Sequence, residues 1–183
     1  MSLTTDKPWI KVWDPLVRYG HWALVAAFTA AYLSADEGSG DTGQLHVWSG
    51  YVVGTIVAVR IVWGIIGSKY ARFSDFAYSP RSALRYFGDL VRGHARRYLG
   101  HSPIGAAMVA ALLLCLSGTV WTGLVAYGGG ADSIAGELHG GLANITLGLV
   151  VLHILGVGLA SVMHRENLVV SMVDGRKRPG DDA

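Results

Sequence analysis

Four long apolar stretches separated by polar segments dominate the hydropathy pattern of the chain. They cover about residues 15–34, 44–67, 103–127 and 134–163. A helix of about 20 apolar residues crosses the ~30 Å hydrocarbon core of a bilayer, and each stretch has that length or nearly so. We therefore expect an all-α integral membrane protein: one four-helix bundle domain spanning residues 1–183.

The connection between the second and third stretches, about residues 68–102, has a helical pattern of its own. Its apolar side chains recur at helical spacing and its arginines fall away from that stripe: Leu84, Phe87, Leu90 and Val91 against Arg81, Arg85 and Arg92. This pattern is typical of a short amphipathic helix lying in the membrane interface. An ordinary solvated loop is the alternative.

Composition supports a membrane location and limits the chemistry. Hydrophobic residues make up 51% of the chain and charged residues 15%. The single Cys115 excludes an internal disulfide and a multi-cysteine metal site. There is no Cys-x-x-Cys-His sequence, so any haem is held without thioether bonds. We expect membrane lipid, and no nucleic acid, as a partner, and a homodimer is compatible with the sequence.

The basic residues predict the orientation. Segment 68–102 holds seven Lys and Arg, the N-terminal segment three and the C-terminal tail four. The two remaining loops hold none, and their acidic residues are Asp36, Glu37, Asp41, Asp132 and Glu137. Because cytoplasmic loops are enriched in Lys and Arg, we expect both termini in the cytoplasm and the protein in the bacterial inner membrane.

Four histidines then sort by depth into two pairs. His139 and His153 are fourteen residues apart on the fourth stretch, which at ~100° and ~1.5 Å per residue places them on nearly one face and ~21 Å apart. His21 begins the first stretch at the cytoplasmic side, and His46 begins the second at the opposite side. The expected pairs are His21 with His153 and His46 with His139.

Two histidines per level suit an iron porphyrin better than zinc. A zinc site uses three or four protein ligands, whereas a haem iron needs only two axial ligands. Arg18, on the face of His21, and Arg60, fourteen residues after His46, are candidates for pairing with haem propionates. The alternatives are interfacial histidines and arginines that extend to the membrane surface.

Several motifs, spread from about Trp9 to Arg178, resemble one family. They are Arg18-Tyr-Gly-His21-Trp22, the stretch from His46 to Arg60 continuing Ile61-Val-Trp63-Gly64, GHARRYLGHSPIG from Gly93 to Gly105, His139 with His153, and His164-Arg165-Glu166-Asn167-Leu168. The chain thus resembles the bacterial cytochrome b-561 family, which includes the cytochrome b subunits of nickel–iron hydrogenases.

The resemblance implies a four-helix cytochrome with two non-covalent b-type haems. It implies electron transfer between the quinone pool and a periplasmic redox partner: a hydrogenase, another dehydrogenase or a cytochrome c. The family's ligand histidines correspond to His21, His46, His139 and His153. Such a protein is an electron-transfer subunit of a quinone-linked oxidoreductase system, and whether it is itself an enzyme stays open.

Two other functions remain as alternatives. One is a superoxide oxidase that passes electrons from superoxide to quinone, and the other is a haem-free membrane anchor or transporter bundle. The acidic loops disfavour superoxide, since an anion is captured best by a positive surface, and they favour a partner with a basic surface. The quinone site has candidates on both sides: His101, His164 and Arg165 on one, Asn144 on the other.

Overall fold

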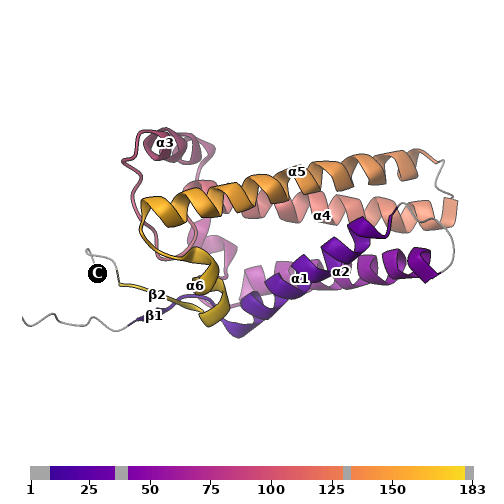
Figure 1. The fold of residues 1–183 in the computed structure, drawn as a ribbon, viewed down its shortest axis with the longest axis horizontal. Helices are drawn as coiled ribbons and strands as arrows, with labels where there is room; N and C mark the ends of the chain where they lie inside the picture. Colours follow the sequence, from indigo (N-terminus) through magenta and orange to yellow (C-terminus); the bar gives the residue numbers. More distant parts are fainter. Residues whose placement is uncertain (1–8, 36–40, 130–132, 180–183) are drawn as a thin grey trace, which may run out of the picture.

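The computed structural model describes residues 9–35, 41–129 and 133–179, and in this part of the chain it is mostly helical. Four long helices lie side by side (Figure 1): α1 Pro15–Leu33, α2 Asp41–Ile66, α4 Pro103–Gly129 and α5 Ile134–Met163. The shorter helices are α3 Pro80–Val91, α6 Leu168–Asp174 and the single 3-10 turn Phe73–Phe76. The predicted helical class is confirmed.

Three of the long helices are long and apolar enough to cross a membrane: Gly43–Ile66, Pro103–Gly128 and Ile134–Met163. Large apolar side chains point outward along them, as lipid surroundings favour; Leu114, Leu155 and Val162 are 73%, 64% and 77% exposed. Helix α1 is not among the three. It has 19 residues and places Arg18 and His21 in its first two turns.

The start of α1 is tied to the end of α2 by one carboxylate. Asp14 caps α1 by accepting a hydrogen bond from the backbone N–H of Val17, and Pro15 occupies the first turn, where its missing N–H costs nothing. The other carboxylate oxygen accepts hydrogen bonds from Trp63 Nε1 at 3.0 Å and from the Ser68 hydroxyl. Asp14 therefore fixes where these two helices meet.

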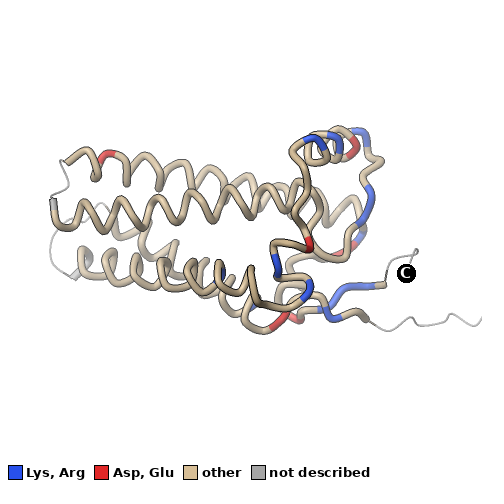
Figure 2. The backbone as a smooth tube through the Cα atoms, turned by 180° about the vertical axis from the view of Figure 1, so that it is seen from behind, with Lys and Arg blue, Asp and Glu red and all other residues tan. Residues whose placement is uncertain are grey.

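Lys and Arg residues gather at one end of the long helices (Figure 2), where α3, α6 and the two strands also lie (Figure 1). We call this the basic end. Of the acidic residues predicted for the other end, Asp36, Glu37 and Asp132 lie outside the described residues, as does the side chain of Asp41. Glu137 is described, in the first turn of α5.

A helix is present in the connection between α2 and α4, where an amphipathic one is predicted. On α3, Leu84, Phe87 and Val91 are exposed, whereas Leu90 is buried together with Tyr86. The apolar stripe is therefore divided. Leu90 packs against the rest of the protein, whereas the other three side chains form an exposed apolar surface.

The two ends of the described chain are joined by a short antiparallel pairing that the sequence pattern does not predict. Strand β1, Ile10–Lys11, pairs with β2, Arg176–Lys177. Gly175 precedes β2 with φ +81° and accepts hydrogen bonds at its carbonyl from Val12 and Trp13. Beside it, Val12, Trp13, Val17 and Ala71 form a small buried cluster. This pairing holds the C-terminal segment against the start of α1.

Candidate metal centre

The structure brings four histidines together as two pairs between helices. His21 of α1 and His153 of α5 have ring centroids 6.3 Å apart, with planes at 56°. His46 of α2 and His139 of α5 have centroids 5.7 Å apart, with planes at 85°. All four side chains are half-buried, and α5 contributes one ring to each pair.

The separation of the two rings in each pair fits the binding of one iron ion between them. A metal–imidazole nitrogen bond of ~2 Å on each side, with about 1 Å from that nitrogen to the ring centroid, places two axial rings roughly 6 Å apart. Gly50 and Gly156 lie one turn beyond His46 and His153, and a Cβ added at either glycine would meet no atom within 4 Å. There is therefore open space next to each of these two glycines. Within the described residues, no group of three or more His, Cys, Asp or Glu is placed to hold a metal ion.

Backbone carbonyls orient the pair distant from the basic end. The Nδ1–H of His46 donates to the carbonyl oxygen of Ala31 at 2.8 Å, and that of His139 donates to the carbonyl oxygen of Thr119 at 2.8 Å. A proton on Nδ1 leaves the Nε2 lone pair of each ring free for a metal, as second-shell hydrogen bonds commonly arrange. Ala31 and Thr119 carry no sequence signal for this role, because they act through backbone atoms.

Gly123 of α4 makes room for the His139 ring. A Cβ built at Gly123 would lie 2.9 Å from both Cε1 and Nδ1 of His139. Any larger residue at this position would displace the ring or the helix. Glycine is frequent at helix contacts in membrane proteins, so its place in the sequence does not by itself reveal this role.

Three buried nitrogen atoms of α1 and α2 lack protein partners within the described residues, and one of them belongs to His21. Among the described residues, His21 Nδ1, Arg18 Nε and Arg60 Nη1 are buried without a hydrogen bond. Buried polar groups are nearly always hydrogen-bonded, so these nitrogens fit a ligand that brings acceptors. A porphyrin with two carboxylates has that chemistry.

The two arginines are held by different contacts. Arg18 Nη2 donates a hydrogen bond to the carbonyl oxygen of Val173 in α6. The Arg60 guanidinium lies 5.2 Å from the centroid of the Phe73 ring. Neither contact uses a carboxylate, so both cations stay available for an anionic group.

Three of the quinone candidates line one cavity at the basic end. His101, His164 and Arg165 contribute to a cavity of about 790 Å³. The His101 ring packs against Phe76 at 4.4 Å and Trp13 at 4.9 Å, and its buried Nδ1 has no partner among the described residues. Burial, with the nearby positive charges of Arg60 and Lys177, lowers the pKa of His101 to about 3, so this imidazole is neutral at pH 7.

The fourth quinone candidate, Asn144, contacts a neighbouring helix. Its Oδ1 accepts a hydrogen bond of 2.8 Å from the Tyr32 hydroxyl of α1. This contact joins α5 to α1 and occupies one acceptor site of the carboxamide oxygen. Interhelical hydrogen bonds of this kind stabilise helix association in membranes.

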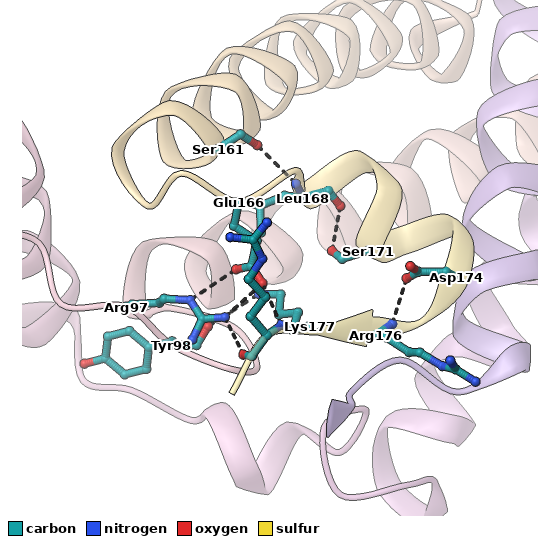
Figure 3. Close-up of polar contacts among 10 residues, drawn as sticks. Arg97, Tyr98, Ser161, Glu166, Leu168, Ser171, Asp174, Arg176 and Lys177 are labelled. Atoms are coloured by element: carbon teal, nitrogen blue, oxygen red, sulfur yellow. Dashed lines mark hydrogen bonds and ion pairs between the residues drawn. The ribbon is translucent and has the colours of Figure 1, made fainter. Parts of the chain in front are cut away.

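A charged cluster around the buried Glu166 (Figure 3) contributes Arg97, Glu166 and Arg178 to the lining of this cavity. Glu166, which is 8% exposed, accepts hydrogen bonds from Arg97 Nη2 at 2.8 Å and Nε at 3.2 Å, and from the Arg178 N–H at 3.2 Å. Burial alone would raise the pKa of Glu166, but the hydrogen bonds from Arg97 and the charge of Lys177 bring it below its ordinary value. Burial lowers the pKa of the Lys177 ammonium.

Helices of membrane-spanning length that carry paired imidazoles are typical of membrane cytochromes of the b type. Comparison with known proteins agrees: residues 12–175 match the family model described as prokaryotic cytochrome b561. The chain belongs to this family, and it is a multi-pass bacterial membrane protein.

Two curated relatives are similar over most of their length. One, from Rhodobacter capsulatus, is named a probable Ni/Fe-hydrogenase B-type cytochrome subunit; it is 25% identical, over 94% of this chain and 83% of the relative. The other, from Bradyrhizobium diazoefficiens, has the same name and is 24% identical, over 94% of this chain and 87% of the relative. No solved structure matches the chain significantly.

Proposed function

We propose that the protein is a di-haem cytochrome b that carries electrons across the bacterial inner membrane, between the quinone pool and a periplasmic redox partner. The observation that carries this proposal is the placement of His21 with His153 and of His46 with His139 at ring separations of 6.3 and 5.7 Å. Each pair would hold one haem b non-covalently through its iron. The bound haem supplies a one-electron redox centre.

The chain's own residues determine what that centre can do. Because each haem would be held by two histidines, no site would be left for a small molecule at the metal, which favours electron transfer. The carbonyl oxygens of Ala31 and Thr119 keep the His46 and His139 rings in one orientation. At the basic end, Arg18 and Arg60 would pair with the propionates and offset their charge.

For the membrane arrangement, we propose that α1 crosses together with the three longer helices, giving four spans. Basic loops stay on the cytoplasmic side, so the basic end and both termini would be cytoplasmic. Helix α3 would lie in the interface, with Leu84, Phe87 and Val91 toward the acyl chains. The two histidine pairs then lie near opposite leaflets, as a path across the bilayer requires.

The partner proposed for the periplasmic side is a redox protein with a basic surface, such as a hydrogenase, another dehydrogenase or a cytochrome c. The names of the two relatives favour a hydrogenase. The acidic residues of the loops opposite the basic end would steer a basic partner. Quinone would exchange electrons with one of the haems. His101 Nδ1, which has no hydrogen-bond partner among the described residues, is suited to a quinone carbonyl group.

The superoxide oxidase alternative makes a different kinetic prediction. If the acidic loops repel anions, the detergent-purified protein should react slowly with superoxide in pulse radiolysis. A reaction near the diffusion limit that slows steeply with added salt would replace our proposal with the alternative. The haem-free anchor alternative requires a colourless protein.

Haem stoichiometry tests the proposal directly. We expect pyridine-haemochrome analysis to give two non-covalent haems per wild-type chain. His21→Ala and His153→Ala should each remove or alter one haem, and His46→Ala and His139→Ala the other, as separated by reduced-minus-oxidised spectra.

A matched control for this series is His94→Ala, because His94 is exposed and belongs to neither pair. It should keep both haems. One haem in the wild type, or the same haem lost in variants of both pairs, would contradict the proposed ligand assignment.

A further inference from the structure

The cavity at the basic end has an excess of positive charge. The arginines that carry it are not those proposed to pair with haem propionates. Beyond Arg97, which is paired with Glu166, three arginines line it: Arg96, Arg165 and Arg178. All three are exposed, and none has a salt bridge to an acidic residue among those the structure describes.

Neither carboxylate in the cavity lining is available to these arginines. Asp75 pairs with Arg72 at 3.0 Å. Glu166 is surrounded by Arg97, the Arg178 N–H and the charge of Lys177. The described lining therefore carries a net positive charge at its mouth, and an anionic group is favoured there.

The cavity wall is aromatic as well as basic. Tyr70, Phe76, Tyr78 and Tyr98 contribute to it, and Tyr78 and Tyr98 lie edge to face, with centroids 5.9 Å apart. Burial raises the pKa of Tyr78, so its phenol stays protonated and can donate a hydrogen bond. Tyrosine is enriched at membrane–water interfaces, where such a cavity would face phospholipid head groups.

An apolar groove adjoins this cavity at Phe76, which lines both. The groove has a volume of about 310 Å³ between α2, the 3-10 turn and α4. Its other lining residues are Ile61, Phe73, Val109, Ala110, Leu113, Leu114 and Ser117. Leu114 is 73% exposed, so the groove opens on the outer surface of the helices, where acyl chains would lie.

A basic, aromatic cavity next to an apolar groove matches one class of ligand. We propose that an anionic phospholipid binds here, with its phosphate among Arg96, Arg165 and Arg178 and an acyl chain along the groove beside Phe76. Guanidinium groups bind phosphate through charge-assisted hydrogen bonds, and basic pockets near helix ends are typical sites for anionic lipid head groups. Binding would fix the C-terminal segment, which carries Arg165 and Arg178, against the membrane.

Native mass spectrometry of the full-length haem-loaded protein tests this site. Delipidated protein in mild detergent is titrated with phosphatidylglycerol, with phosphatidylcholine and with inorganic phosphate. We expect one tight phosphatidylglycerol per chain and weaker phosphatidylcholine binding. Millimolar phosphate should not displace the lipid, because the groove also contributes. Full displacement by phosphate would overturn the proposal in favour of a free-phosphate site.

Two variants that each remove three positive charges distinguish a specific lipid site from general electrostatic attraction between the protein and anionic lipid. Arg96→Gln/Arg165→Gln/Arg178→Gln should weaken phosphatidylglycerol binding roughly a hundredfold, since each cation near an anionic lipid contributes about fivefold and the three contributions multiply. The control removes three charges from α3 instead: Arg81→Gln/Arg85→Gln/Arg92→Gln. Equal weakening in both triple variants would overturn the proposal.

A second variant leaves the charges intact and fills the groove. Ala110→Trp should weaken phosphatidylglycerol binding while both haems are kept, which also shows that the variant is folded. Unchanged binding in Ala110→Trp and in Arg96→Gln would refute the site. A co-purifying quinone lost from the triple-arginine variant, with phosphatidylglycerol binding unchanged, would refute it as well.

Discussion

Replacing Gly123 by alanine is the sharpest perturbation of the proposed haem site. The new Cβ would lie 2.9 Å from Cε1 and Nδ1 of His139, whereas ordinary van der Waals contact begins at 3.4 Å. The ring must therefore withdraw by the difference, about 0.5 Å. Metal–ligand distances are normally held within about 0.2 Å, so this displacement is large for a ligand.

The expected loss can be estimated from the contact that breaks. Withdrawal of the ring stretches the 2.8 Å hydrogen bond from His139 Nδ1 to the Thr119 carbonyl oxygen. Loss of such an orienting contact commonly costs 10–100-fold in metal affinity. Alanine is about 1 kcal/mol better than glycine in a helix interior, so a weakened helix would not explain the loss. We expect Gly123→Ala to keep about one haem per chain.

The assay is pyridine-haem quantitation with low-temperature reduced-minus-oxidised spectra. The remaining signal in Gly123→Ala should match that of His139→Ala, because both variants act on the same pair. Gly128→Ala is the matched control, since it lies on the same helix and its added Cβ meets no atom within 4 Å. Two haems with wild-type spectra in Gly123→Ala would refute the steric reasoning.

Three further outcomes follow from the basic end. Glu166→Gln should lower the free energy of unfolding by about 2 kcal/mol at pH 7, the scale of a hydrogen bond to a charged group. The folded pKa of Glu166 lies below its ordinary value, so its stabilisation is present above that ordinary value and is lost as the pH falls through the folded pKa. The advantage of the wild type over Glu166→Gln in thermal melts should therefore shrink below about pH 4.5. Gly175→Ala should destabilise the folded protein by about 1–2 kcal/mol or more in the same melts, since φ is +81° and non-glycine residues are strained there. Gly93→Ala is the control for backbone strain alone, because φ is +75° and the added Cβ has open space. Arg60→Gln should lower the midpoint potential of one haem in a redox titration and leave the other unchanged, because a removed positive charge no longer stabilises the reduced form. Equal shifts of both haems would contradict the proposed pairing of Arg60 with a propionate of one haem.

The sequence by itself determined the features that depend on local periodicity. Apolar stretches of membrane-spanning length specify helices, because a backbone in lipid must satisfy its hydrogen bonds internally. The fourteen-residue interval between His139 and His153 fixes their shared face through helix geometry alone. Several short motifs, spread from about Trp9 to Arg178, together indicated the family.

Only the tertiary structure decided which atoms support these side chains. The acceptors for His46 and His139 are carbonyl oxygens on neighbouring helices, and backbone atoms leave no mark in residue identity. The space for the His139 ring depends on how closely Gly123 of α4 approaches α5. Such approach distances are set by packing between helices, which a hydropathy pattern does not encode.

Contacts between distant parts of the chain show the same division. Arg97 and Glu166 are 69 positions apart, and Arg18 and Val173 are 155 apart. The sequence around each of these residues does not indicate its distant partner. Both contacts follow from the return of the C-terminal segment across the basic end. The burial of Glu166 makes its charge costly to leave unpaired, which favours the contact with Arg97.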